Sequence, residues 1–218
     1  MSDLYTIKNN EKDGKDLYKK YLRNYKKINE YKRAIRYFVL NRITYSGTVY
    51  SGGYSQLSFE KRFTYSSIER LRPVSRIISD VFIKNDDYSN FLYKSSRKVF
   101  LYLDPPYYKY KESKLYGRKG DLHINFKHEK FAEDMKNYKY HNWLITYDNS
   151  DKIKELFSFA NIYEFNVQYY MDNYNGKKPK TGEELFITNY RVPKIILNKL
   201  SIKNKKLEYR LIPVNKKR

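Results

Sequence analysis

The chain has 218 residues, of which 40% are hydrophobic and 18% aromatic, including 26 tyrosines. This aromatic content excludes a disordered chain, even though 32% of the residues are charged. The net charge of +21 favours a polyanion such as nucleic acid as partner, although a lysine-rich genome would give the same excess. The absence of cysteine excludes disulfides, thiolate metal sites and catalytic thiols, including the thiol used in carbon-5 cytosine methylation.

The apolar residues indicate neither a membrane span nor a secretion signal. No apolar run approaches the roughly 18 residues of a transmembrane helix, and the polar start lacks the apolar stretch of a signal peptide. We therefore expect a cytoplasmic protein that does not bind a membrane. His123 and His128 lie too irregularly for a zinc-protease motif, so we expect surface histidines and no bound metal.

Residues 1–79 are predicted to form a lobe of helices and loops. Apolar and tyrosine residues recur every three or four positions over 15–40, which predicts one helix with Lys and Arg on the opposite face. Residues 41–56 hold three of the eight glycines among Ser, Thr and Tyr, so a loop or hairpin is expected there. A further helix is predicted over 65–79, interrupted at Pro73 because proline lacks a backbone N–H.

From residue 80 onward, short apolar runs alternate with helical periods. Residues 80–103 have the pattern of a strand, a turn, a helix and a strand, and a helix around 128–139 precedes an apolar strand at 142–149. The next predicted elements are a helix, a strand, a loop and a strand, in the runs DKIKELFSF, NIYEFNVQYY, NYNGKKPKTGEE and ELFITNYRV. This alternation favours an α/β fold with a mostly parallel sheet, whose last strand would be antiparallel if the loop before it forms a hairpin.

One predicted strand ends in an acid and two prolines, in the segment KVFLYLDPPYYKY at residues 98–110. Ligands of open α/β sheets bind beyond the carboxyl ends of strands, where Asp104 is expected. The Asp104 carboxylate and the Pro105 carbonyl can accept both hydrogens of an aromatic amino group, which favours the pyramidal nitrogen that attacks a methyl donor. Pro105 and Pro106 fix the backbone, and Tyr107 offers a flat face to an unstacked base. The alternative is a plain proline turn with Tyr107 packed on the core.

The run FLYLDPPYY resembles the catalytic motif of the adenine-N6 DNA methyltransferases of the Dam and DpnII type. Other segments are similar to that family in the same order, over roughly residues 30–191. LNRITYSGTVYSGGYS is similar to its inserted DNA-reading region, and IKNDDYSNFL to the turn that holds the adenine ring of S-adenosylmethionine. WLITYDN and GEELFITNY are similar to later strands. Guanine-N2 RNA methyltransferases also use Asp-Pro-Pro-Tyr, so an RNA methyltransferase is one alternative.

The resemblance implies a site-specific methyltransferase that moves a methyl group from S-adenosylmethionine to a flipped adenine in double-stranded DNA, in a restriction-modification setting. It implies a Rossmann-like class I methyltransferase sheet in residues 80–218, incomplete at its N-terminus and followed by a basic C-terminal tail. It also implies a mainly helical DNA-recognition lobe in residues 1–79.

The resemblance gives individual residues their expected roles. Four residues would bind the flipped adenine: Asp104, Pro105, Pro106 and Tyr107. Asp104 would also lie near the methionine end of the cofactor. Asp87 would accept a hydrogen bond from the cofactor's adenine or ribose, and Tyr88 would pack on that ring. The alternative for this pair is a helix N-cap followed by a core tyrosine.

The same loop that holds three glycines would contact DNA. Four of its residues carry this expectation: Arg42, Tyr45, Ser46 and Gly47. The alternative is a surface turn without a ligand.

The family's cofactor site opens with a glycine-rich FxGxG turn between a strand and a helix, and no such turn is recognisable here. Glycines are needed there because the backbone approaches the cofactor closely. The first glycine, Gly14, follows no predicted strand. Three explanations are open: the C-terminal piece of a split gene, assembly with a separately encoded N-terminal half, or a catalytically inactive DNA-binding subunit. A sheet without its central strand would expose apolar edges, so we expect poor solubility or a need for a partner.

Overall fold

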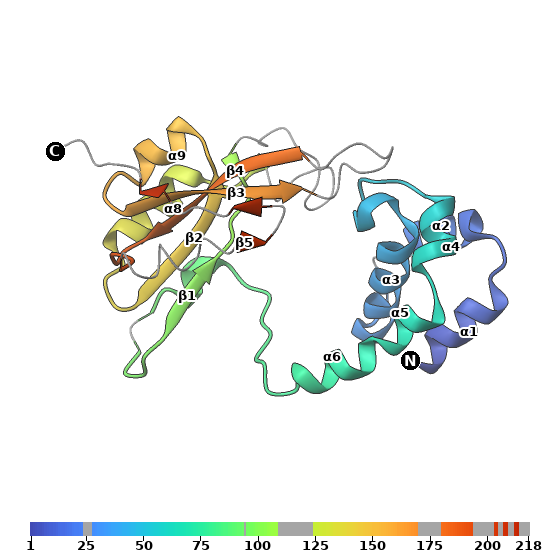
Figure 1. Cartoon of the computed structure of the whole chain (residues 1–218). Helices are drawn as coiled ribbons and strands as arrows, with labels where there is room; N and C mark the ends of the chain where they lie inside the picture. The colour runs from blue at the N-terminus through green and yellow to red at the C-terminus, as the bar shows by residue number, and fades with distance from the viewer. Residues whose placement is uncertain are drawn as a thin grey trace. The chain divides into compact units, whose positions relative to one another are not determined.

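The computed structural model divides the chain into two compact units, drawn in Figure 1. One unit holds residues 1–85, and the other begins at Asp86. The described residues are 1–23, 28–93, 95–108, 124–169 and 180–193, with strand pieces at 203–204, 207–208 and 212–213. Within these ranges, no helix is long and apolar enough to span a membrane.

The unit of residues 1–85 is helical. Its helices are α1 (Ser2–Asn10), α2 (Gly14–Arg23), α3 (Glu30–Ile43), η1 (Tyr45–Gly47), α4 (Gln56–Arg62), α5 (Tyr65–Glu69) and α6 (Leu71–Ile77). Val39, Leu40 and Ile43 lie on one face of α3 and are fully buried. They join Leu17 of α2 in one apolar cluster, so the three- and four-residue spacing of apolar side chains produces the core of this unit.

The prediction of one helix over 15–40 is wrong, because the described residues form two. α2 ends at Arg23, and α3 begins after Asn29. The Asn29 side chain accepts a hydrogen bond from the backbone N of Lys32 at 2.9 Å. This cap satisfies one of the N–H groups that a helix start leaves unpaired, so a local polar contact outweighs the continuous apolar period.

The segments that follow α3 are close to expectation. The loop predicted over 41–56 is shorter in the structure, because 41–43 belong to α3 and 56 begins α4. The residues between these helices form the loop, which contains η1 and is closed by an isolated antiparallel bridge between Thr44 and Tyr54. The helix predicted over 65–79 is interrupted at Arg70, between α5 and α6, and not at Pro73. Pro73 is the third residue of α6, where no intrahelical N–H bond is lost.

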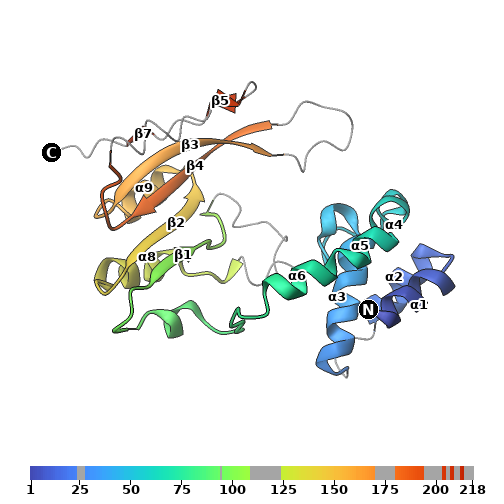
Figure 2. The same ribbon diagram turned by 60° about the horizontal axis from the view of Figure 1, so that its bottom comes forward.

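The unit that begins at Asp86 is built on a sheet whose described strands have the order β1-β2-β4-β3-β7. β1 and β2 run parallel, whereas β4 is antiparallel to both β2 and β3. Figure 2 shows β1 at one end of the sheet, beside β2. The strands of this sheet are β1 (Phe100–Leu103), β2 (Asn142–Asp148), β3 (Asn161–Tyr169), β4 (Lys180–Thr188) and β7 (Ile212–Pro213). The short strands β5 (Lys203–Asn204) and β6 (Leu207–Glu208) pair with each other.

The expectation of a mostly parallel sheet is wrong for the described strands, which form a mixed sheet. The expected antiparallel last strand is confirmed, since β3 and β4 pair from Asn161 with Thr188 to Tyr169 with Lys180. Only ten residues separate these two strands, fewer than a parallel crossover needs. The alternation of strands and helices therefore predicted the α/β class but not the direction of the last strands.

Two helices cover the apolar core of this sheet, α8 (His128–Asn137) and α9 (Asp151–Leu156). Both were expected from the sequence. Ile145 of β2 lies opposite Ile187 of β4, and both side chains are fully buried. The rings of Phe131 from α8 and Phe157, which follows α9, have centroids 6.1 Å apart. The two helices thus pack on one cluster, which fixes the carboxyl end of β2.

The strand predicted at the start of residues 80–103 is not formed. Residues 81–87 pair with no described strand, and the 3-10 helix η2 (Tyr88–Phe91) follows them. Phe82 is 86% exposed, and its neighbours Val81 and Ile83 are exposed too. An apolar run without a neighbouring strand has no ladder to join, which explains the difference.

Candidate active site

The Asp-Pro-Pro-Tyr segment lies directly after β1, as the sequence predicts. Leu101 and Leu103 pack on the core, whereas Asp104 is exposed and Pro105 is buried. The parallel register pairs Leu103 with Ile145. The next residues on the two strands are therefore Asp104 and Thr146, which lie side by side.

Thr146 holds the Asp104 carboxylate in one orientation. The Thr146 hydroxyl, which is buried, donates a hydrogen bond to Asp104 Oδ1 at 2.8 Å. No described residue donates a hydrogen bond to the second carboxylate oxygen, Oδ2. Because the side chain is exposed and one oxygen is fixed, the other is available to a ligand beyond the strand.

Tyr107 is half-buried and is held by an acid from β4. Its hydroxyl donates a hydrogen bond to Glu184 Oε2 at 2.9 Å, and its ring lies 6.3 Å from that of Tyr147. Burial, followed by the negative charge of Glu184, raises the pKa of Tyr107 well above its ordinary value. The hydroxyl therefore stays protonated at neutral pH and anchors the ring. The contact with the core agrees in part with the alternative of a packed tyrosine.

Asp148 holds the backbone that follows the two prolines. Its Oδ1 accepts a hydrogen bond from the backbone N of Tyr108 at 2.5 Å, and the residue is buried. Its other oxygen is buried without a hydrogen-bond partner among the described residues. A buried carboxylate oxygen left unpaired is costly, so Asp148 is a polar group retained at the expense of stability.

Three of these polar residues were not assigned from the sequence, namely Thr146, Asp148 and Glu184. Two of them follow buried apolar residues in the run WLITYDN, at the carboxyl end of β2, and that position was the available signal. Glu184 could not be found in this way because it enters from an antiparallel strand. It lies opposite Asp148 in the register of β2 and β4.

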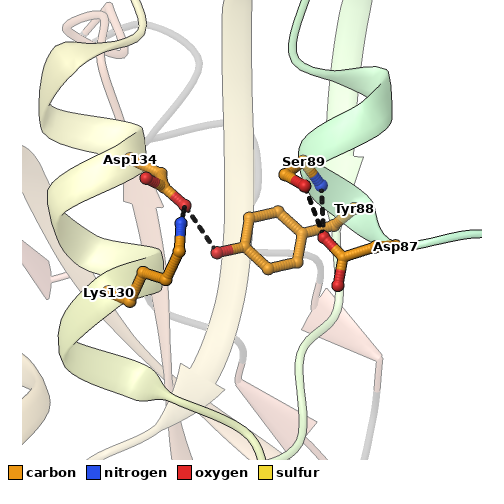
Figure 3. A network of polar contacts seen from close by, with 5 residues as sticks. All are labelled: Asp87, Tyr88, Ser89, Lys130 and Asp134. Atoms are coloured by element: carbon orange, nitrogen blue, oxygen red, sulfur yellow. Dashed lines mark hydrogen bonds and ion pairs between the residues drawn. The ribbon is translucent and has the colours of Figure 1, made fainter.

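Asp87 caps the helix η2. Figure 3 shows its Oδ1 atom accepting hydrogen bonds from Ser89, at 2.9 Å from the backbone N and 2.6 Å from the hydroxyl. These bonds lower the pKa of Asp87, the side-chain bond first and the backbone bond second. The carboxylate is fully exposed. This geometry is that of the alternative, an N-cap, and it leaves the outer part of the carboxylate accessible.

Tyr88 packs inside its unit. Its hydroxyl donates a hydrogen bond to Asp134 Oδ2 at 2.7 Å, and the same oxygen binds Lys130 Nζ at 2.7 Å (Figure 3). Its ring meets the Phe131 ring edge to face, with centroids 4.9 Å apart. These contacts give Tyr88 a structural role and fix its ring on α8.

The described residues do not complete a site for S-adenosylmethionine. Between Asp86 and the C-terminus, Gly182 inside β4 is the one described glycine, so no described glycine turn lies at the carboxyl end of β1. Gly14 belongs to helix packing, since a Cβ atom there would lie 2.5 Å from the Phe59 ring. Among the described residues, Asp87 and Asp104 offer exposed carboxylates, but no glycine turn allows the close backbone approach that the methionine end of the cofactor requires.

Arg42, the basic residue of the expected DNA-contacting loop, lies in the last turn of α3. Its guanidinium carbon is 5.4 Å from the centroid of the Phe38 ring, and its Nε is buried without a hydrogen-bond partner among the described residues. Burial lowers the pKa of Arg42, and the charges of Arg62 and Arg70 lower it further. In the described part of the chain no carboxylate pairs with these three arginines. Among the described residues, the positive charges of these three arginines are therefore not balanced by an ion pair.

The turn after Arg42 has an unusual backbone. Ser46 and Gly47 both have positive φ angles, 49° and 75°. Asn41 Nδ2 donates a hydrogen bond to the Gly47 carbonyl at 2.9 Å, and a Cβ atom on Gly47 would lie 3.1 Å from Arg62 Nη2. Tyr45 is 41% exposed beside them. Three of the four residues expected to contact DNA thus form the turn η1, which lies next to Arg62 at Gly47, and the fourth, Arg42, lies at the end of α3 just before it.

One histidine expectation is wrong. His128 was expected on the surface but is buried, with Nδ1 2.7 Å from the Tyr147 hydroxyl. His123 lies outside the described residues. In the part of the chain that the structure describes, no group of three or more His, Asp or Glu side chains is placed to hold a metal ion.

Comparison with known proteins gives one family. A search among curated proteins finds no match. The family model of the D12 class N6 adenine-specific DNA methyltransferases matches residues 2–171, which is well over half of the chain and includes the Asp-Pro-Pro-Tyr segment, the Asp87 turn and the Arg42 loop. Since the match spans both units, the chain belongs to the D12 class N6 adenine-specific DNA methyltransferase family.

Proposed function

We propose that this chain binds a flipped adenine of double-stranded DNA and directs methylation of its N6 atom, with S-adenosylmethionine as methyl donor, in a restriction-modification setting. The observation that carries the proposal is the state of Asp104. It lies exposed at the end of β1, with one carboxylate oxygen held by Thr146 and the other without a hydrogen-bond donor among the described residues. Family membership supplies the substrate class, an adenine in DNA.

The chemistry of the acceptor follows from two oxygen atoms. The free oxygen of Asp104 and the carbonyl of Pro105 would each accept one hydrogen of the adenine amino group. The nitrogen would then become pyramidal, and its lone pair would leave the ring system. Negative charge at Asp104 would also stabilise the positive charge that grows on nitrogen as the methyl group arrives. Pro105 and Pro106 limit the motion of the acceptor, which reduces the entropy lost in reaching this geometry.

Tyr107 would hold the plane of the flipped base. Its ring is partly accessible, and Glu184 anchors its hydroxyl, so the ring keeps one orientation before the base arrives. Asp148 fixes the next peptide N–H, at Tyr108. An aromatic face with a fixed tilt stacks on any adenine that leaves the duplex, and this stacking offsets part of the cost of unpairing.

Fewer residues of this chain support the proposed position of the methyl donor. S-adenosylmethionine would lie beyond β1, with Asp104 near its methionine end and Asp87 and Tyr88 near its nucleoside. The exposed Asp87 carboxylate supports this arrangement. Because the Tyr88 hydroxyl is bound to Asp134, only the edge of the Tyr88 ring could contact the cofactor. A Rossmann-like sheet is consistent with the parallel pair β1 and β2 followed by antiparallel strands.

The helical unit would contact the DNA. Arg42, near the charges of Arg62 and Arg70, would bind a backbone phosphate, because a phosphate would neutralise charge that no described carboxylate balances. Tyr45, Ser46 and Gly47 would lie against the same strand of DNA. Residues 1–79 would then serve recognition, and residues 80–218 catalysis.

The test is the identity of the methylated base. The chain, alone and together with the N-terminal cofactor-binding part of an active D12 class methyltransferase, is incubated with labelled S-adenosylmethionine and either unmethylated DNA or RNA, and the product is digested to nucleosides. We expect label in N6-methyladenine from DNA, and none when Asp104→Ala replaces the wild type. Label in methylguanine from RNA would identify the enzyme as an RNA methyltransferase. DNA binding without transfer in any reaction would indicate an inactive DNA-binding subunit.

A further inference from the structure

Arg62 and Arg70 both lie near Arg42, although the three arginines come from different helix ends. Arg42 lies in the last turn of α3 and Arg62 in the last turn of α4, whereas Arg70 lies between α5 and α6. The positive charges of Arg62 and Arg70 act on Arg42 and, after burial, are the next causes that lower its pKa. The fold of the helical unit therefore brings together three charges that are far apart in the sequence.

Two of these guanidinium groups are held by the residues around them. The guanidinium carbon of Arg42 lies 5.4 Å from the centroid of the Phe38 ring, and its Nε is buried. Arg62 lies over Gly47, where a Cβ atom would be 3.1 Å from Arg62 Nη2 and 2.8 Å from Asn41 Nδ2. Gly47 thus does more than allow a positive φ in the turn, because its lack of a side chain leaves the space that Arg62 occupies.

The grouping of these charges favours an anion as ligand. Like charges held near one another repel, and partial burial of Arg42 reduces the screening by water. A phosphate would remove this repulsion, since its oxygens can accept N–H bonds from more than one guanidinium. The alternative is that each arginine stabilises the end of its own helix, where positive charge is favourable. That role accounts for an arginine at each helix end, but it does not account for the proximity of all three.

We infer that Arg42, Arg62 and Arg70 form one anion site that binds a single phosphate of the DNA backbone. Gly47 is a positioning residue of this site, because the space above it lets Arg62 reach the phosphate that Arg42 contacts. The inference rests on the proposed function for the identity of the ligand. It adds Arg62 and Arg70 to the DNA contacts and assigns all three arginines to the same phosphate.

Thermal melting of the whole chain tests the anion site without DNA. Inorganic phosphate should raise the melting temperature of the wild type more than chloride does at the same ionic strength. Arg62→Ala and Gly47→Ala should lose most of this difference, and the remainder measures the general stabilisation that phosphate gives to proteins. The matched control is Gly53→Ala, which should keep the wild-type difference. Gly53 also has a positive φ, 66°, but a Cβ atom there would meet nothing within 4 Å.

The salt dependence of DNA binding tests whether the arginines share one phosphate. Arg42→Ala should lower the slope of log affinity against log salt by about one. The double variant Arg42→Ala and Arg62→Ala should lower the slope by no more than that, because both side chains contact the same phosphate. At a fixed salt concentration its affinity should still be lower than that of Arg42→Ala. Fluorescence anisotropy over a salt series gives both quantities.

Two results would overturn the inference. A slope lowered by about two in the double variant would assign a separate phosphate to each arginine. An equal effect of phosphate on the melting of the wild type, Arg62→Ala and Gly47→Ala would leave the arginines their role at helix ends.

Failure of the assignment to DNA has a different signature. Stabilisation by phosphate that depends on Arg62 and Gly47, with unchanged DNA affinity in the same variants, would overturn the DNA ligand and keep the anion site. DNA binding with the predicted slopes but without methyl transfer would contradict only the proposed catalysis, and the shared phosphate would stand.

Discussion

The two sides of β1 differ in how completely they are built. On the β2 side, Asp104 meets Thr146, Tyr107 meets Glu184, and the peptide after them is held by Asp148, all above a packed core. On the other side, the strand edge is unpaired by the described chain.

The difference shows which side of β1 the described residues order. On the β2 side, the groups that would handle the amino acceptor are positioned by hydrogen bonds before any ligand binds. On the other side, the described residues supply no glycine turn that would hold a methyl donor. Substitutions on the β2 side should therefore damage catalysis directly.

The largest effect is expected at the reacting amine. Asp104→Asn keeps an oxygen for Thr146 but removes the negative charge that would stabilise the developing cation. We expect the rate of methyl transfer to fall by at least about 100-fold, with DNA affinity unchanged. Single-turnover rates with saturating DNA measure this. A rate within a few-fold of wild type would remove Asp104 from the chemistry and assign the β2 side a structural role.

Thr146→Val tests whether the fixed carboxylate matters. Valine has nearly the same shape but cannot donate to Asp104, so the acid would sample other orientations. We expect kcat to fall about tenfold, equivalent to about 1.4 kcal/mol, with KM for DNA little changed. Thr146→Ser keeps the hydroxyl and should restore most of the rate. A loss in Thr146→Ser with a full rate in Thr146→Val would show that the methyl group matters and the hydrogen bond does not.

The stability of the fold at alkaline pH tests how Tyr107 is packed. Burial and the Glu184 charge raise the pKa of Tyr107 in the folded state. A tyrosine in the unfolded chain ionises at about pH 10, whereas Tyr107 in the folded protein stays protonated there. The contribution of Tyr107 to the free energy of unfolding is therefore complete below about pH 10 and is lost as the pH rises above it. Urea unfolding at several pH values should show a shallower alkaline decline for Tyr107→Phe than for wild type.

The matched control for this titration is Tyr37→Phe, because Tyr37 is 59% exposed. Tyr37→Phe should have the same stability as the wild type at neutral pH, because an exposed side chain loses no packing. At neutral pH, Tyr107→Phe should also cost about 1 to 3 kcal/mol, since Glu184 loses a buried donor. Identical declines for Tyr107→Phe and wild type would mean that Tyr107 ionises freely, contrary to the contacts described for it.

The smallest effect is expected at the end of α3, where Arg42 is proposed to contact DNA. Arg42→Ala should weaken DNA binding to the same degree on all sequences and reduce the slope of log affinity against log salt by about one, the value for one phosphate contact. Fluorescence anisotropy over a salt series measures both. Arg33→Ala is the control, because Arg33 is exposed on the same helix and pairs with Glu30 at 3.3 Å. Equal slopes for the two variants would refute a phosphate contact at Arg42.

The sequence predicts where most residues of the candidate site lie, but it predicts less of the strand pairing in the sheet. Asp104 and its prolines are recognisable because a buried strand runs straight into them, and the Arg42 turn because glycines gather there. The pairing of Glu184 with Tyr107 depends on strand direction, which local patterns do not encode. The run around Phe82 has the composition of a strand, yet strand formation depends on a neighbour that the run itself cannot specify. The break at Asn29 was missed because one capping contact interrupts an otherwise continuous apolar period.

The most direct test of the account measures methyl transfer by the purified chain and by its Asp104→Ala variant, each with and without the N-terminal cofactor-binding part of an active D12 class methyltransferase. Labelled S-adenosylmethionine and unmethylated DNA are the substrates, and N6-methyladenine is the product counted. We predict N6-methyladenine from the wild-type chain in at least one of its two reactions, and none from Asp104→Ala in either. Equal product from the wild type and from Asp104→Ala would contradict the account, because the exposed acid at the end of β1 would then have no part in the transfer.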